Sequence, residues 1–120
     1  MDRRGILLFA HGSRDPLWRL PIEAVAEAIR ERDASALACC AYLELSQPDL
    51  MQAASDLIAA GARQLRVFPL FLGVGKHARE DLPGLVAQLR ALHPGVPVEL
   101  MPAVGEYPQL TALMAEIALS

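Results

Sequence analysis

Four short apolar runs alternate with stretches of helical periodicity, and this alternation limits the possible folds more than any other feature of the chain. The apolar runs, each of strand length, cover residues 5–10, 36–43, 65–68 and 96–100. The order of elements is therefore βαβαβαβα with short connections, which favours right-handed crossovers. We predict one α/β domain over residues 1–120: a doubly wound, four-stranded parallel sheet flanked by helices.

Capping residues and prolines indicate where the first two helices begin and end. Asp15-Pro16 offers a cap and a first-turn proline to the first helix, in which Pro21 must lie in the first turn or kink the helix. Ser46-Gln47-Pro48-Asp49 matches a capping box with Ser46 as the cap, and Gly61 is placed to end the second helix in the left-handed conformation. Apolar spacing places the other two helices at residues 82–92 and 110–117.

The composition excludes several classes of protein. Hydrophobic residues make up 53% and charged residues 21% of the chain, which argues against disorder. A net charge of −3 argues against a broad surface for nucleic acid or an anionic membrane. No apolar run approaches the roughly 18 residues of a membrane span, and the start of the chain does not match a signal peptide, so we expect a cytoplasmic protein. Cys39 and Cys40 are adjacent, which favours two reduced cysteines in a buried strand.

Three residues that could carry chemistry lie where predicted strands end. His11 follows the first strand, Glu44 closes the second, and His77 lies in a glycine-containing loop expected at residues 70–77, after the third. Ligands of open α/β sheets bind beyond the carboxyl ends of the strands, so a parallel sheet would bring these side chains to one edge. Each alone has an ordinary structural explanation, but two imidazoles and a carboxylate together suit Fe, Co, Ni or Zn. His93, at the end of the third helix, is assigned a structural role only.

Other mechanisms common in α/β domains lack their residues here. A phosphoacceptor domain needs an acidic residue at the end of the third strand, where this chain has Phe68-Pro69-Leu70-Phe71. The glycine patterns of nucleotide-binding loops and the G-x-S-x-G pattern of acyl hydrolases do not occur. Histidine phosphotransfer would want an arginine before the histidine, where Ala10 stands.

Three ordered motifs resemble a known family. They are residues 9–16 (FAHGSRDP), residues 42–48 (YLELSQP) and residues 69–83 (PLFLGVGKHAREDLP). Together they resemble the CbiX/SirB family of class II tetrapyrrole chelatases in its short, single-domain form, from about residue 6 to the last helix. The resemblance implies a chelatase-like domain with flavodoxin-like layering. It also implies insertion of Co²⁺, Fe²⁺ or Ni²⁺, with cobalt favoured, into sirohydrochlorin or a close relative with release of two protons, as in cobalamin, sirohaem or nickel tetrapyrrole biosynthesis.

The resemblance also implies roles for individual residues. His11 would be a metal ligand and proton acceptor, His77 the second histidine ligand, and Glu44 an acidic residue that assists metal binding. The metal would be a substrate, with no permanently bound cofactor. The residues implied to contact the macrocycle or its carboxylates are Arg14, Gln47, Leu72, Gly73, Val74, Gly75 and Lys76, with Arg79 as a further cation near them. Several relatives carry Glu where this chain has Gln47, so a carboxylate is missing at that position.

The size of one domain suggests how such a substrate would be enclosed. A chain of this length has a radius of gyration of roughly 14 Å, so one copy could cover one face of a tetrapyrrole but not surround it. We therefore expect a symmetric homodimer. The residues leave open a non-catalytic carrier of metal or tetrapyrrole that uses the same site, and a small interaction domain; a metal-dependent hydrolase has less support.

Overall fold

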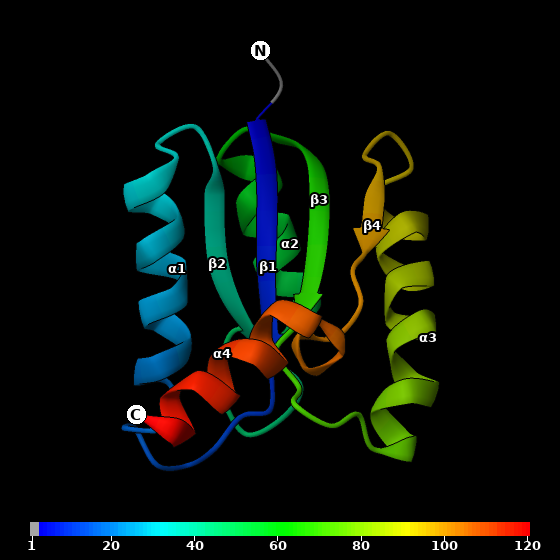
Figure 1. Cartoon of the computed structure of the whole chain (residues 1–120). Coiled ribbons are helices and arrows are strands. Elements are labelled where there is room, and N and C mark those ends of the chain that lie inside the picture. Colours follow the sequence, from blue (N-terminus) through cyan, green and yellow to red (C-terminus); the bar gives the residue numbers. More distant parts are fainter. Residues whose placement is uncertain (1–2) are drawn as a thin grey trace.

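A computed structural model of the chain, described here for residues 3–120, has a parallel sheet with helices on both of its faces (Figure 1). The elements in chain order are β1 (Arg3–Ala10), α1 (Leu20–Arg32), β2 (Leu37–Tyr42), α2 (Leu50–Ala59), β3 (Ala62–Pro69), α3 (Lys76–Leu92), β4 (Val98–Leu100), the 3₁₀ helix η1 (Val104–Glu106) and α4 (Pro108–Leu119). The strands lie in the order β2-β1-β3-β4 and all pair in parallel. The predicted α/β fold class is confirmed.

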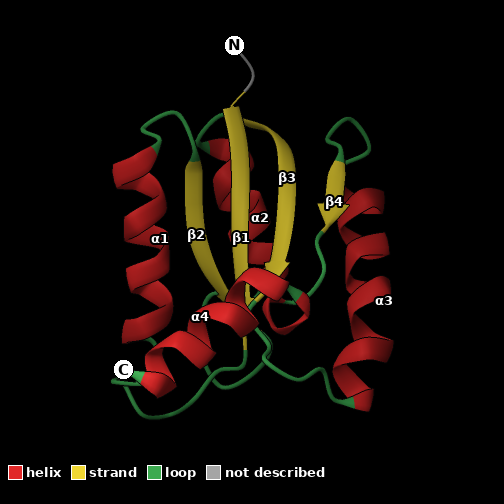
Figure 2. Cartoon of the chain, in the orientation of Figure 1, coloured by secondary structure: helices red, strands yellow, loops and turns green. Residues whose placement is uncertain are grey.

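Burial on both faces of β1 explains its continuous apolar run. Leu7 and Phe9 belong to the larger core, which α2 and α3 complete, while Leu8 packs with Ala26 of α1 on the opposite face. Figure 2 shows β1 in the middle of the sheet, with α2 behind it and α4 crossing in front near the strand ends. The carboxyl ends of β1, β2 and β3 therefore meet at one edge, which is where the candidate residues were expected.

The first helix begins later than its capping pattern predicted. α1 starts at Leu20, with Pro21 in its first turn. A helix that started at Asp15 would hold Pro21 in its interior, where proline lacks an N–H and clashes with the preceding turn. Asp15 instead stabilises a turn, in which its carboxylate accepts a hydrogen bond from the Leu17 N–H at 2.9 Å.

The cap of the second helix was also predicted at the wrong residue. α2 starts at Leu50, and Asp49 is its N-cap, because the Asp49 carboxylate accepts the Gln52 N–H at 2.9 Å. The hydroxyl of Ser46 is used elsewhere: it accepts the Ser13 N–H at 3.1 Å and donates to the Ser13 carbonyl at 2.9 Å. A contact between distant loops therefore takes the side chain that local spacing assigned to a cap. The end of α2 is as predicted, with Gly61 at φ +114°.

The third strand and third helix are longer than predicted. Pro69 is the last residue of β3 rather than a residue beyond it, and α3 begins at Lys76 instead of near residue 82. His77 consequently lies in the first turn of a helix and not in a loop. Pro83 is tolerated inside α3 because the buried residues Ala78, Leu82, Val86 and Leu89 form a helical stripe whose packing outweighs one missing N–H.

The last helix is apolar but contributes nothing to the core. α4 matches the predicted position, yet none of its residues is buried. Leu113, Met114, Ile117 and Leu119 are all exposed. In this part of the chain, apolar spacing predicted a helix correctly, although the apolar side chains of that helix are not buried. No helix within residues 3–120 is both long enough and apolar enough to cross a membrane.

Candidate functional site

His11 and Glu44 meet at the carboxyl edge of the sheet, as the parallel arrangement predicts. β1 and β2 pair through Ala10 and Tyr42, so the next residues of both strands leave the sheet together. The Nδ1 atom of His11 lies 3.2 Å from Oε1 of Glu44, and both side chains are about half exposed. A carboxylate on Nδ1 favours the tautomer with its proton on that atom, which leaves the lone pair of Nε2 free for a metal or a proton.

A close approach of two loops keeps His11 and Glu44 together. A Cβ atom added to Gly12 would lie 1.7 Å from the Glu44 carbonyl oxygen, a distance that only glycine permits. The hydrogen bonds between Ser13 and Ser46 join the same two loops. Leu45, between Glu44 and Ser46, has φ +63°, a left-handed conformation that costs a residue other than glycine roughly 1 to 3 kcal/mol. The surrounding contacts must therefore hold this turn in place.

Two aromatic residues complete the surroundings of His11. The centre of its imidazole ring lies 4.7 Å from that of Phe71, at an angle of 45°. The indole N–H of Trp18 donates to the His11 carbonyl at 2.9 Å. The sequence alone did not single out either residue as functional. The hints were that Phe71 lies within the third motif, residues 69–83, and that the single tryptophan of the chain follows His11 by seven residues.

His77 does not join the His11–Glu44 pair. It is exposed in the first turn of α3, and residues 3–120 contain no group of three His, Cys, Asp or Glu side chains placed to hold a metal ion. The expected arrangement of three ligands is thus present in the structure only as one pair. Gly73 and Gly75 precede His77, and a Cβ atom added to either would have no neighbour within 4 Å. A side chain at either position would therefore meet no other part of the described chain.

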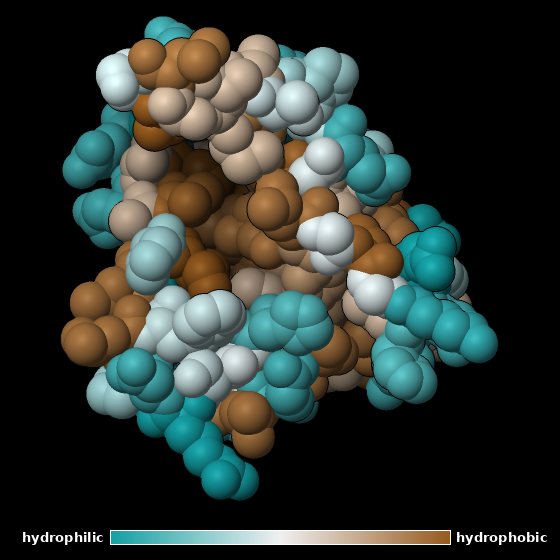
Figure 3. Space-filling model, turned by 60° about the horizontal axis from the view of Figure 1, so that its bottom comes forward, coloured by the Kyte–Doolittle hydropathy of each residue, from teal (hydrophilic) through white to brown (hydrophobic). Residues whose placement is uncertain are grey.

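An apolar hollow of about 680 Å³ opens beside His11. Leu17, Trp18 and Pro21 line one part of it, and Phe71 and Leu72 line another. The space-filling view of this side shows a deep apolar depression bordered by polar groups (Figure 3). Leu72 and Gly73 are the residues of the predicted macrocycle-binding set that lie in this hollow.

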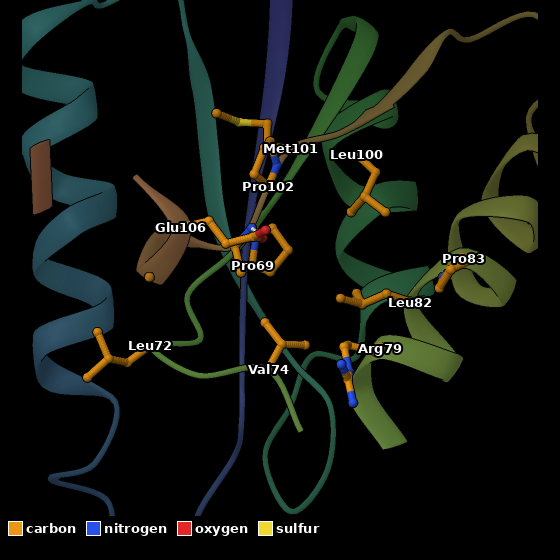
Figure 4. A pocket seen from close by; sticks show the side chains of 12 residues that line it. Pro69, Leu72, Val74, Arg79, Leu82, Pro83, Leu100, Met101, Pro102 and Glu106 are labelled. Atoms are coloured by element: carbon orange, nitrogen blue, oxygen red, sulfur yellow. Dashed lines mark hydrogen bonds between the residues drawn. The ribbon is translucent and has the colours of Figure 1, made fainter. Parts of the chain in front are cut away.

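A second cavity, of about 600 Å³, lies between the start of α3 and the residues after β4. Val74, Leu82 and Arg79 are among the residues that line it, and Figure 4 shows Leu82 and Arg79 extending from α3 toward the side on which Val74 lies. Leu72 lines both cavities. The carbonyl of Leu72 would be 1.6 Å from a Cβ atom added to Gly105, so η1 supports the segment that separates the two cavities.

Three further predicted residues, Arg14, Gln47 and Lys76, do not line the hollow beside His11. Gln47 lines two other hollows, one with Tyr42 and one with Met51, and His11 lines neither of these. Arg14 and Lys76 are exposed. Gln47 lies between β2 and α2, whereas His11 follows β1, so the two residues do not share a cavity.

The two cysteines are free, half-buried thiols rather than fully buried ones. Burial raises the pKa of Cys39 to about 11, with a smaller contribution from Cys40. Burial also raises the pKa of Cys40. Both thiols therefore stay protonated near neutral pH, which makes them poor nucleophiles and poor metal ligands.

The chain is similar in sequence to proteins of one family. The family model described as CbiX matches residues 5–119. A sirohydrochlorin cobaltochelatase of Saccharolobus solfataricus is 37% identical over 82 residues, which cover 68% of this chain and 62% of the relative. A chloroplastic sirohydrochlorin ferrochelatase of Arabidopsis thaliana is 33% identical over 86 residues, which cover 72% of this chain and 38% of the relative. In four other sirohydrochlorin cobaltochelatases, the match spans between 57% and 66% of the relative's length.

Solved structures show the same fold. The crystal structure of a putative cobalamin biosynthesis CbiX protein from Marinobacter aquaeolei superposes with a TM-score of 0.82 at 36% identity, covering 96% of this chain and 93% of that one. The sirohydrochlorin chelatase SirB from Bacillus subtilis in complex with cobalt superposes with a TM-score of 0.77 at 23% identity, covering 97% of this chain and 51% of that one.

Proposed function

The chain belongs to the CbiX family, and on that premise we propose that it is a sirohydrochlorin chelatase, which inserts a divalent metal into a tetrapyrrole with release of two protons. The observation that carries the proposal is the His11–Glu44 pair at the edge of an apolar hollow. A metal-binding imidazole and an apolar surface for a flat ring are the two elements that such a reaction needs in one place.

The arrangement of His11 supports a direct role in the reaction. During metal insertion, two pyrrole N–H protons leave the ring while ring nitrogens replace the water molecules on the ion. Glu44 occupies Nδ1 of His11, so Nε2 is the atom that receives the metal or a pyrrole proton. Glu44 acts mainly by orienting the ring and by supplying negative charge beside a dication. The metal passes through the site as a substrate, and the protein keeps no permanent cofactor.

His77 is proposed as a second imidazole for the metal. It lies exposed in the first turn of α3, two residues after Gly75. To share a metal with His11, His77 would have to move toward it together with the first turn of α3. Lys76 and Arg14 are exposed cations that would pair with the carboxylates of the substrate at the rim, and Gln47 would contribute only to its outer part.

The metal and the cellular setting are also proposals. Relatives are named as cobaltochelatases and as a ferrochelatase. We propose Co²⁺ as the metal. Fe²⁺ and Ni²⁺ are the alternatives, because imidazole and carboxylate ligands accept all three ions. The corresponding settings are cobalamin, sirohaem or nickel tetrapyrrole synthesis in the cytoplasm.

We further propose that the working form is a homodimer. α4 presents Leu113, Met114, Ile117 and Leu119 to solvent with no residue buried, which is unusual for an apolar helix. A second copy of the chain would cover these side chains and enclose the substrate between two sheet edges. Ile117→Glu should then convert a dimer into a monomer in sedimentation velocity experiments and lower chelation. Full activity in a strictly monomeric wild-type protein would contradict the dimer.

The function is tested with purified protein, sirohydrochlorin and Co²⁺ under anaerobic conditions, following the absorption spectrum of the macrocycle. We expect acceleration of metal insertion with many turnovers, and a loss of about 100-fold or more in His11→Ala. His93→Ala is the matched control, because His93 caps the far end of α3 and should not affect the rate. Stoichiometric binding without acceleration would indicate a carrier, and full activity of His11→Ala would contradict the assignment.

A further inference from the structure

Trp18, the only tryptophan of the chain, has an unusual combination of exposure and contact. It lies between β1 and α1, is 51% exposed, and lines the hollow beside His11. A tryptophan ring carries a large apolar area, and about half of this side chain remains in contact with solvent. Its indole N–H is nevertheless fixed on the His11 carbonyl at 2.9 Å. The ring is therefore held in a defined position at the edge of the hollow.

The hollow is suited to a flat, mainly apolar ring. Its volume of about 680 Å³ is in the range of small-molecule sites, and Pro21, Phe71 and Leu72 continue the apolar surface from Trp18. Two ionisable side chains line the hollow within residues 3–120, those of His11 and Asp15. The Asp15 carboxylate already accepts the Leu17 N–H. Carboxylate arms of a ligand would find no cation inside and would have to point outward, so the hollow itself fits the ring face.

His11 and Trp18 are structurally coupled. Trp18 contacts the backbone of His11, Phe71 lies against its imidazole, and Glu44 holds its Nδ1 atom. The reactive Nε2 atom and the indole ring thus belong to one connected unit at the same opening. A ring resting on Trp18 would be placed in a fixed relation to the imidazole, which is the condition for efficient transfer of a metal or a proton.

We infer that Trp18 is a substrate-binding residue whose ring forms the platform for one face of the tetrapyrrole, and whose indole N–H ties that platform to His11. This inference rests on the proposed function. It extends the substrate site toward α1, to a residue that lies outside the three motifs. A second copy of the chain seated in this hollow would bury His11 and exclude the substrate. One experiment can therefore distinguish a tetrapyrrole in the hollow from a second copy of the chain in the hollow.

The indole N–H resonance of Trp18 gives a direct readout without turnover, because a chain with one tryptophan has one such signal. Metal-free sirohydrochlorin is titrated into the ¹⁵N-labelled protein, and the dissociation constant is measured in parallel from the absorption of the macrocycle. Ring-current shifts decline steeply with distance. We expect the Trp18 indole signal to move more than the backbone amides of α2 and β4.

Two variants separate the two parts of the side chain. Trp18→Leu removes the aromatic face and should raise the dissociation constant for metal-free sirohydrochlorin about tenfold. Trp18→Phe keeps an aromatic face but loses the N–H, so it should change the dissociation constant by less than about threefold and lower kcat more than KM. Leu92→Ala is the control, because Leu92 is a similarly exposed apolar residue at the end of α3. It should change neither the dissociation constant nor the kinetic constants.

The outcomes distinguish this inference from the proposed function. If the wild-type protein binds sirohydrochlorin and inserts metal, but the indole signal stays in place and Trp18→Leu binds normally, the platform is refuted and the chelatase stands. If the wild-type protein neither binds the substrate nor inserts metal, the proposed function fails and the inference with it. If Trp18→Leu changes the sedimentation coefficient while substrate affinity is unchanged, the hollow is a contact between copies, and the platform is again refuted.

Discussion

Replacing Gly12 by alanine should disrupt the site through a single methyl group. The added Cβ atom would lie 1.7 Å from the Glu44 carbonyl oxygen, whereas real contacts of this kind are not shorter than 3.0 Å. The obstacle is backbone, which cannot rotate away as a side chain can. The loops that carry His11 and Glu44 must therefore separate by at least 1.3 Å. This separation takes Nδ1 of His11 and Oε1 of Glu44, which lie 3.2 Å apart, out of hydrogen-bonding range.

The size of the effect follows from this displacement. A misplacement of about 1 Å at a reacting group costs roughly 100-fold in rate, so we expect kcat/KM of Gly12→Ala to fall by about that factor. Overpacking of this kind costs roughly 1 to 3 kcal/mol, which corresponds to a fall in Tm of about 4 to 12 °C in a domain of this size.

The experiment compares chelation rates well below Tm with thermal unfolding followed by circular dichroism. Gly84→Ala is the matched control, because its Cβ atom would meet nothing within 4 Å and lies inside α3. Alanine there should leave the rate unchanged and stabilise the helix by up to about 1 kcal/mol. Wild-type activity and Tm in Gly12→Ala would refute the argument that this close approach positions the site.

Further substitutions test other parts of the site. Glu44→Ala should weaken metal binding about 10- to 100-fold by titration calorimetry, and Glu44→Gln less, since the amide still contacts His11; equal losses would show that charge alone matters. His77→Ala should lower metal affinity and chelation together with Tm unchanged, because this side chain is exposed; unchanged affinity would exclude it as a ligand. Gly105→Ala should displace the Leu72 carbonyl and weaken tetrapyrrole binding more than metal binding. The folded state holds the Cys39 proton up to a pKa of about 11, against 9.0 ordinarily, so the free energy of unfolding should fall as pH rises through this range; Cys39→Ala should flatten that fall, and identical profiles would contradict the shift.

Local patterns were sufficient for the order of the elements. The apolar runs indicated four strands, and the spacing of apolar residues indicated the helices between them, because burial on a sheet or along a helical stripe leaves a period in the sequence. The same reasoning placed His11 and Glu44 together, since parallel strands bring their carboxyl ends to one edge. It also predicted that His77 would join them, which was wrong, because the start of α3 depends on how Ala78 and Leu82 pack.

Tertiary contacts decided what local patterns could not. Ser46 has the chemistry of a helix cap and serves instead to join two loops, and Asp49 caps α2 in its place. Spacing likewise predicted α4 as a helix without showing that its apolar side chains remain exposed, because burial depends on what lies opposite a surface.

The amino-acid sequence by itself determined the α/β alternation and the candidate residues that follow the strands, because these depend on patterns over a few residues. Only the tertiary structure decided which candidates meet. Gly12 lets one loop touch the next, Trp18 reaches the carbonyl of His11, and Phe71 lies against its ring. These contacts join residues from separate elements, and their geometry follows from how the whole sheet and its loops pack.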